Sequence, residues 1–529
     1  MSWIDWILVG VYLLGLVVLG VKLGKTNKTE KDYFLGGRNF KWWAIGLSII
    51  ATQVSAVTFI GAPGWAYTDG LSAIIMTLNI PLVLFFISGI FHPFFYNIQV
   101  TSVYEYLEKR FGKVIRALMA FAFLFKSIMV MGTILYAPAL VLARVTGISI
   151  YLAIGIMAAI GIFYTILGGI KAVIWTDVTQ MVVLWFGLVL TIFTVVQSMP
   201  GDFTTSIASI RDAGRMTALN FTQGLSVANS VWAGLIGGAV LHLGYFGIDQ
   251  AQVQRVLTAK SMRHVKHSLW FGGFVVVIQM FFFMMMGSFL YVYFQGIPFE
   301  NPNDVFIRFA LTEFPVGLLG IIIAAIFASA MSSLDSLLNS MTTVVIKDVY
   351  KNHMNPGASD EQVLKISKKL TLVFGIFMAV FAVIVSTSNL SILEAISVYG
   401  SYLLGSMLGV FILGMLTVKA NEKGTAAGFV LGIVAVAFVA QNTEVYWMWN
   451  NLIGAGTTII AGYVISICTG SETKDITLYT IQGQKALFDK RKFSEMEDGV
   501  FIAPGRFEKR SYGLLIYLAV ILLFFYLIG

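Results

Sequence analysis

Long apolar runs recur along nearly the whole sequence, and their number constrains the fold more than any other feature. A run of about 20 apolar residues is long enough to cross a bilayer as an α-helix. We count fourteen such runs, at residues 3–21, 42–68, 71–96, 114–143, 149–169, 173–198, 231–254, 268–294, 316–346, 370–388, 391–417, 424–440, 446–468 and 512–528. With 58% hydrophobic and 12% charged residues, the sequence predicts an all-α polytopic membrane protein. The first run lacks the basic start and cleavage site of a signal peptide, so we expect it to be retained.

The lysines and arginines are distributed unevenly between the predicted loops. Thirty of the 35 fall in alternate loops, as in a membrane protein whose basic loops stay in the cytoplasm. This bias predicts that both termini lie outside, and it accounts for the formal net charge of +8 without any role for nucleic acid. Residues 471–511 include the most basic of these loops and are expected to form a partly ordered cytoplasmic linker.

A polar stripe interrupts the apolar run at residues 316–346. Ser329, Ser332, Ser333 and Ser336 follow the i, i+3, i+4, i+7 spacing of one helix face, and Asp335 lies beside them. Serine-rich faces also let helices pack closely in membranes, but close packing does not explain a carboxylate there. Because oxygen ligands suit a small hard cation, the stripe predicts an ion site within the membrane.

Two runs contain residues that interrupt a regular helix at membrane depth, where irregular backbone is tolerated only beside protein or water. Residues 51–58 are polar and β-branched, and residues 237–247 contain four glycines and a histidine. These runs open two sets of five spans, which is typical of inverted-repeat transporters with a site at the midplane. We therefore expect one transmembrane domain over 1–529, with repeats at 42–198 and 231–417 and extra helices at 3–21, 424–468 and 512–528.

A second carboxylate, Asp177, lies about 9 Å beyond Lys171 into its apolar run, at a rise of about 1.5 Å per residue. A carboxylate at this depth must be protonated, paired with a basic side chain or bound to an ion. The residues themselves leave all three alternatives open.

Four motifs resemble those of the sodium/solute symporter family. They are TSVYEYLEKRF at 101–111, YTILGGIKAVIWTDVTQ at 164–180, GIDQAQVQR at 247–255 and SSLDSLLNS at 332–340. The resemblance covers residues 30–470. LYAPALVLARVTG, WTDVTQ and DQAQVQR are similar to the branch with animal iodide, monocarboxylate and multivitamin transporters, whose general pattern bacterial sugar and sialic acid carriers share. It implies a LeuT-type fold, in which two five-helix repeats are inverted and helices 1 and 6 are broken.

The resemblance also implies which residues bind sodium. A conserved site would use the backbone carbonyls of Ala51, Val54 and Ser329 and the hydroxyls of Ser332 and Ser333. A second site, present in some members, would use Asp177, Ser332, Asp335 and Ser336, with Asp335 standing where some relatives have serine. We therefore expect two sodium ions.

For the solute, the resemblance implies a cavity between the two repeats. The candidate contacts are Gln53, Ser55, Thr58, Thr77, Asn79, His242 and Ser397, with Tyr245 at the position of an aromatic gate. The charged residues that bind sugars or sialic acid in relatives are replaced by Met76, Val130 and Val276. Lys126 lies one helical turn from Val130, so it is placed to attract an organic anion, to pair with an internal acid or to snorkel towards the membrane surface. His242 has the alternative role of a hydrogen-bonded packing residue.

The expected function is sodium-coupled import of an organic anion, a sugar or a related polar metabolite, in a plasma membrane and specifically a bacterial inner membrane. A sodium-dependent sensor and an ion channel are the alternatives. An enzyme or an ATP-driven pump is not expected, because the sequence has no HExxH motif, no P-loop and a single cysteine, Cys468. Sodium, a small solute and the bilayer are the expected partners, with no obligate protein partner.

Overall fold

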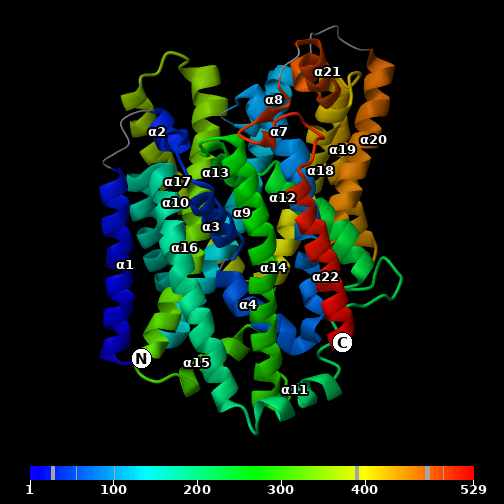
Figure 1. The fold of residues 1–529 in the computed structure, drawn as a ribbon. Coiled ribbons are helices and arrows are strands. Elements are labelled where there is room, and N and C mark those ends of the chain that lie inside the picture. The colour runs from blue at the N-terminus through cyan, green and yellow to red at the C-terminus, as the bar shows by residue number, and fades with distance from the viewer. Residues whose placement is uncertain (25–29, 55, 101, 388–391, 471–476, 492–493) are drawn as a thin grey trace.

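The computed structural model describes residues 1–24, 30–54, 56–100, 102–387, 392–470, 477–491 and 494–529. They form a bundle of long helices that run roughly side by side between two faces (Figure 1). Both chain ends, α11 (Phe203–Asp212) and α15 (Asp304–Glu313) lie towards one face, which we call the terminal face. The opposite face, which we call the basic face, carries α2 (Glu30–Leu35), α8 (Val103–Arg110) and α21 (Ile481–Arg491).

Among the described residues, ten helical stretches are long and apolar enough to cross a membrane, and three shorter apolar helices accompany them. The all-α membrane architecture predicted from the sequence is confirmed, whereas the number of fourteen crossings stays a prediction. Nine of the ten stretches lie in α1 (Trp3–Gly24), α9 (Lys113–Thr146), α10 (Ile150–Ser198), α14 (Met262–Tyr293), α16 (Leu318–Val344) with its π-helical extension η5 (Val345–Met354), α17 (Asp360–Ser386), α19 (Glu422–Asn442), α20 (Trp449–Thr469) and α22 (Tyr512–Ile528), and the tenth covers Ala56–Ile98. The helix α18 (Ile392–Leu416) contains one of the shorter apolar helices, Gly400–Leu416.

The helix α10 contains two of the predicted spans. Arg144, just before α10, pairs with Asp304 at 3.9 Å, and Ser198, the last residue of α10, donates a hydrogen bond to Glu313 at 3.4 Å. Both ends of α10 therefore lie beside α15 at the terminal face, although a straight helix of 49 residues would be about 74 Å long. The chain must fold back inside α10, and its two apolar legs are Ile150–Phe163 and Ile170–Ser198.

The predicted run at 42–68 is broken into α3 (Trp42–Gln53) and α4 (Ala56–Asp69). Val54 at the end of α3 has an extended backbone (φ −104°, ψ 101°), so the predicted break in this run is confirmed. The following run consists of short helical pieces, which are η2 (Gly70–Ile74), α5 (Ile75–Leu78), α6 (Ile80–Phe86), η3 (Ile87–Phe91) and α7 (His92–Ile98).

The second broken run comprises η4 (Ala233–Gly237), α12 (Gly238–Gly247) and α13 (Gln250–Leu257). The predicted break is present, but its position differs from the glycine-rich stretch at 237–247. That stretch is helical from Gly238 onward, and the helix stops only at Ile248. Asp249 then begins α13 as its N-cap, because its carboxylate accepts a hydrogen bond from the Ala251 amide.

The centre of the bundle is α16, which is buried along nearly its whole length and contacts α3, α9 and α10. Its polar stripe is therefore surrounded by protein. Polar residues at membrane depth require such surroundings, because lipid offers them no hydrogen-bond partners.

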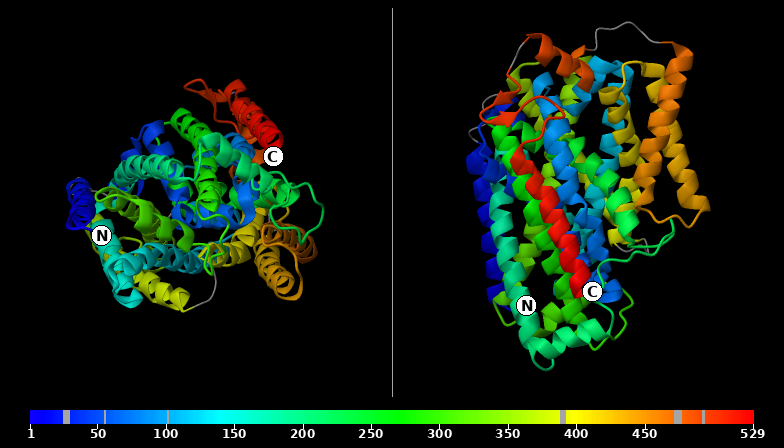
Figure 2. Two further views of the ribbon diagram at one scale, coloured as in Figure 1. Left: turned by 90° about the horizontal axis from the view of Figure 1, so that it is seen from below. Right: turned by 45° about the vertical axis from the view of Figure 1, so that its right-hand side comes forward.

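Residues 477–511 include ordered elements that pack on the basic face, seen in red and orange in the right-hand view of Figure 2. They are η6 (Thr477–Tyr479), α21, a two-stranded antiparallel sheet of β1 (Met496–Glu497) and β2 (Val500–Phe501), and η7 (Lys509–Ser511). Phe507 stacks on Phe85 of α6 with 4.4 Å between ring centroids, and the buried Lys266 of α14 pairs with Glu508 at 2.6 Å.

Candidate functional site

The end of α3 exposes backbone carbonyls that a continuous helix would have satisfied. The last four carbonyls of an α-helix have no partner within the helix, and this end of the helix carries partial negative charge. The Val54 amide still donates to the Ile50 carbonyl at 3.2 Å, and the carbonyls of Thr52 and Gln53 follow at the break. The Thr52 carbonyl accepts hydrogen bonds from the hydroxyls of Ser333 and Tyr245, each at 3.4 Å. These oxygens create a negative site in the middle of the bundle.

The serine stripe of α16 faces this break. Ser333 Oγ lies 3.4 Å from the carbonyl oxygen of Thr52 and 3.4 Å from that of Ser329. Ser329, Ser332 and Ser333 are each only 1% exposed. The structure thus brings the end of α3 and the Ser333 hydroxyl of α16 together, while the Ser332 hydroxyl donates to Asp177 and that of Ser329 to the Ile326 carbonyl. The assignment of these residues to a sodium site stays a prediction.

The predicted second ion site is connected by hydrogen bonds to an arginine that the sequence analysis did not single out. Asp177 Oδ1 accepts a hydrogen bond from Ser332 at 2.6 Å, and Asp177 Oδ2 lies 3.2 Å from the Arg255 guanidinium and accepts from Ser48. Arg255 also donates to Ser48 at 2.7 Å and to Ser336. Arg255 and Asp177 are 0% exposed, so of the three alternatives for Asp177 the structure contains the basic partner.

Asp335 lies at the edge of this network. Its carboxylate accepts hydrogen bonds from Thr176 and Ser336, each at 3.2 Å. Ser336 therefore connects Asp335 to Arg255, and through it to Asp177. All four predicted ligands of the second site share one hydrogen-bonded cluster.

A cavity of about 220 Å³ lies directly beside the break. Thr52 and Ser333 line it, so the cavity and the candidate sodium site share a wall. From there the lining extends to Trp65, one turn before the end of α4, and to Trp447 between α19 and α20.

Four of the predicted solute contacts line this cavity: Gln53, Thr58, His242 and Tyr245. Asn79 lies behind them, because its Oδ1 is 2.7 Å from His242 Nδ1 and its amide donates to the Gly234 carbonyl at 2.9 Å. Thr77 is buried and donates to the carbonyl of Ile74 at 3.0 Å. Ser55 and the side chain of Ser397 lie outside the described residues.

Two residues of opposite charge also line the cavity. Lys126 of α9 forms an ion pair with Asp249 at the start of α13, and their side chains are 7% and 2% exposed. Of the three roles considered for Lys126, the structure contains the pairing with an internal acid. An aspartate before Gln-Ala-Gln at a helix start is the sequence signal that could have identified Asp249 as a cap.

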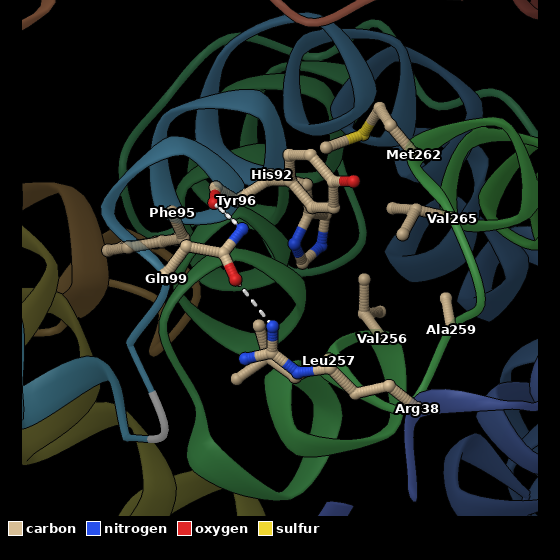
Figure 3. Close-up of a pocket in the computed structure, with 10 residues that line it drawn as sticks. All are labelled: Arg38, His92, Phe95, Tyr96, Gln99, Val256, Leu257, Ala259, Met262 and Val265. Atoms are coloured by element: carbon tan, nitrogen blue, oxygen red, sulfur yellow. Dashed lines mark hydrogen bonds between the residues drawn. The ribbon is translucent and has the colours of Figure 1, made fainter. Parts of the chain in front are cut away.

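A second, smaller cavity lies at the basic face between α7, α13 and α14 (Figure 3). Its volume of about 20 Å³ is enough for about one water molecule and not for a solute. Gln99 accepts a hydrogen bond from Arg38 at 2.5 Å and donates to the Tyr96 carbonyl at 2.8 Å, which links η1 (Gly36–Arg38) to the end of α7.

Comparison with known proteins identifies the fold and the family. Residues 33–432 match the model of the sodium:solute symporter family. The chain belongs to this family. The symporter is 32% identical to the sodium/sialic acid symporter SiaT of Proteus mirabilis over 463 residues, which are 86% of this chain and 92% of that protein. It is 31% identical to the sodium-coupled monocarboxylate transporter 2 of Mus musculus over 451 residues, 82% of this chain and 72% of that protein.

A solved structure of a sodium-coupled sialic acid symporter, described as substrate-bound and outward-open, has a TM-score of 0.83 and 30% sequence identity to the symporter. It covers 89% of this chain and 100% of its own length. Mhp1, a nucleobase-cation symporter, has a TM-score of 0.54 at 13% identity and covers 89% of this chain, which shows the shared fold alone. The symporter therefore has the LeuT-type fold, and it is a sodium-coupled transporter of a small solute and not an enzyme.

Proposed function

We propose that the symporter imports a small polar solute by alternating access, and that sodium bound between α3 and α16 enables the cavity to bind this solute. The observation that carries this proposal is the approach of Ser333 to the freed carbonyl of Thr52, because both residues also line the cavity. A cation bound there holds two walls of the cavity in position.

The conserved sodium site would consist of five oxygens. We assign them to the carbonyls of Ala51, Val54 and Ser329 and the hydroxyls of Ser332 and Ser333. Support comes from the negative end of α3, which favours a cation, and from the burial of the three serines, which removes competing water.

A second sodium would bind among Asp177, Ser332, Asp335 and Ser336. Both oxygens of Asp177 already accept hydrogen bonds, and Arg255 supplies a positive charge beside them. A sodium ion at this position therefore requires the contacts of Arg255 with Asp177 and Ser336 to loosen.

The direction of transport follows from the distribution of charge. The basic face carries the loops with most of the lysines and arginines, so we assign it to the cytoplasm of a bacterial inner membrane and both termini to the outside. The cavity extends from the break towards Trp65 and Trp447, whereas Arg255 joins α3, α10, α13 and α16 on the other side of the break. This arrangement corresponds to a carrier that receives solute from outside.

Energetically, sodium entry supplies the driving force. Each elementary charge that moves inward gains about 2.3 kcal/mol per 100 mV of membrane potential. Because binding free energies are reciprocal, sodium that raises solute affinity is itself bound more tightly when solute is present. We further propose that residues 42–198 and 231–417 form the two inverted repeats and that no obligate protein partner is needed.

Candidate solutes are suggested by the relatives, whose names specify sialic acid and monocarboxylates. Both are carboxylates, so the panel to be tested begins with small carboxylates and includes sugars. In proteoliposomes, we expect solute to accumulate only under an inward sodium gradient. Equal uptake in potassium or choline medium would contradict coupled transport, and binding without uptake would indicate a sensor.

A further inference from the structure

The solute cavity contains a compact ion pair that its sodium chemistry does not require. Among the described residues that line the cavity, only Lys126 and Asp249 belong to the types Lys, Arg, Asp and Glu, and the two form an ion pair with each other. Both are almost fully buried, with 7% and 2% of their side chains exposed. Two charges held in such a place each need a partner at all times, because a buried unpaired charge is strongly unfavourable.

The two charges belong to different parts of the fold. Lys126 lies in the middle of the continuous helix α9, where its ammonium is also 5.7 Å from the ring of Phe123. Asp249 lies at the break between α12 and α13, where its carboxylate accepts a hydrogen bond from the Ala251 amide at 2.9 Å. The positive end of α13 thus lies beside this carboxylate. The pair therefore connects a continuous helix to a broken one across the wall of the cavity.

The charge of the solute decides whether this pair remains satisfied. A monoanion that binds Lys126 competes with Asp249, and a cation that binds Asp249 competes with Lys126. A zwitterion can insert its carboxylate next to Lys126 and its ammonium next to Asp249, so that all four charges stay paired. The geometry thus favours a solute that carries both charges.

The contact between the two side chains also limits the distance between the solute charges. An α-amino acid carries its ammonium and its carboxylate on the same carbon, which matches a pair in direct contact better than widely separated charges do. The remaining wall includes apolar side chains such as Val130, Ile134 and Leu404. The volume of about 220 Å³ is below the range of about 300–1,000 Å³ typical of sites for drug-sized ligands.

We propose that the solute of this symporter is a neutral α-amino acid with an apolar side chain, whose carboxylate binds Lys126 and whose ammonium binds Asp249. This inference rests on the proposed function, because it assumes that the cavity beside the α3 break is the transport site. It assigns the two residues the role of specificity determinants for that site.

Matched probes test the inference. Each set contains an amino acid, the same molecule without its ammonium group and the same molecule without its carboxylate. One set is leucine, 4-methylpentanoate and 3-methylbutylamine, and smaller and larger sets are built on alanine and phenylalanine. In proteoliposomes with an inward sodium gradient, we expect the uptake of at least one amino acid to exceed the uptake of both of its analogues by about tenfold or more.

Charge-removing variants then test the assigned roles. D249N is expected to shift preference towards the carboxylate analogue, and K126M towards the amine analogue. The double variant K126M/D249N removes both charges, retains a neutral wall and is expected to lose discrimination among the three probes. The matched control is K266M/E508Q, which removes another buried ion pair outside the cavity and is expected to leave the preference unchanged.

The outcomes separate this inference from the proposed function. If sodium drives uptake of a monocarboxylate or a sugar in preference to every amino acid, coupled transport stands and the zwitterion assignment is wrong. The assignment is also wrong if D249N and K126M reduce the uptake of all three probes by the same factor. If a sodium gradient drives none of the probes, including the carboxylates and sugars, the proposed function itself fails.

Discussion

Replacing Ser333 by alanine removes one hydroxyl from the contact between α3 and α16. If this hydroxyl only donates hydrogen bonds to carbonyls, the loss is small, whereas if it also binds sodium, the loss depends on the sodium concentration. In the structure, Ser333 Oγ lies 3.4 Å from each of its two carbonyl partners, Thr52 and Ser329. Such long hydrogen bonds belong at the weak end of the usual contribution of about 0.5–1.5 kcal/mol. Without sodium, S333A is therefore expected to change the free energy of unfolding only slightly.

With sodium the expected effect is larger, because the hydroxyl becomes a ligand of a cation. A hydrogen-bonding group that interacts with a charge is worth about 1.5–3 kcal/mol, which corresponds to about a 10- to 150-fold loss of sodium affinity. At a sodium concentration of about 100 times the wild-type Kd, bound sodium stabilises the fold by about 2.7 kcal/mol. A 100-fold weaker variant would retain only about 0.4 kcal/mol of this stabilisation under the same conditions.

The assay is thermal unfolding of the purified protein across a titration of NaCl against choline chloride at constant ionic strength. We expect the sodium midpoint of S333A to rise, while its Tm in choline stays near that of the wild type. S288A is the matched control, since buried Ser288 of α14 also donates to a carbonyl at 3.4 Å, that of Met284, outside the site. If S333A keeps the wild-type sodium midpoint, Ser333 is not a ligand.

Three further perturbations test the packing and charges around the site. In G287A the added Cβ would lie 2.8 Å from the Pro63 carbonyl carbon, so we expect the free energy of unfolding to fall by about 1–3 kcal/mol in a denaturation assay. G272A is the control and is expected to be neutral, because the atom nearest to its added Cβ, Ile49 Cγ2, is 3.8 Å away. D177N leaves the buried Arg255 charge unpaired and is expected to cost about 3–5 kcal/mol, most of which R255M/D177N should restore; equal stability of both variants would contradict the pairing. Hydrogen bonds from Thr204 and Thr205 lower the pKa of Asp202 from 3.8 to about 2, so its stabilisation of α11 is present above pH 3.8 and is lost as pH falls through about 2. Hydrogen exchange of residues 203–212 should be faster in D202A than in the wild type at neutral pH, and the difference should narrow as pH falls below about 2; equal rates at neutral pH would refute the cap.

The first break and the serine stripe could be predicted because their signal is local. Polar and β-branched residues at 51–58 interrupt an otherwise apolar run, and helical spacing alone places Ser329, Ser332 and Ser333 on one face. The structure adds what spacing cannot contain, which is that the two elements face each other.

The position of the second break could not be predicted from glycine content. The glycines at 237–247 permit close packing and do not bend the helix, since a Cβ on Gly237 would lie 2.7 Å from the Met448 carbonyl oxygen and one on Gly244 would lie 2.9 Å from Leu404. The chain breaks after them, at Ile248, where Asp249 caps the next helix.

Pairings between distant residues were beyond the reach of the sequence. Arg255 and Asp177 are 78 residues apart, and Lys126 and Asp249 are 123 residues apart. The positive-inside pattern groups Arg255 with the lysines of a cytoplasmic loop, but the structure buries it completely beside Asp177. Only the fold determines which buried charge neutralises which.

Sodium held between α3 and α16 is expected to control solute affinity, and reciprocal binding measures this most directly. The affinity of the purified protein for an accumulated probe solute is determined in NaCl and in choline chloride, and ²²Na⁺ affinity is determined with and without that solute. We expect sodium to raise solute affinity and solute to raise sodium affinity by the same factor. A solute affinity that is identical in NaCl and choline chloride would contradict this coupling.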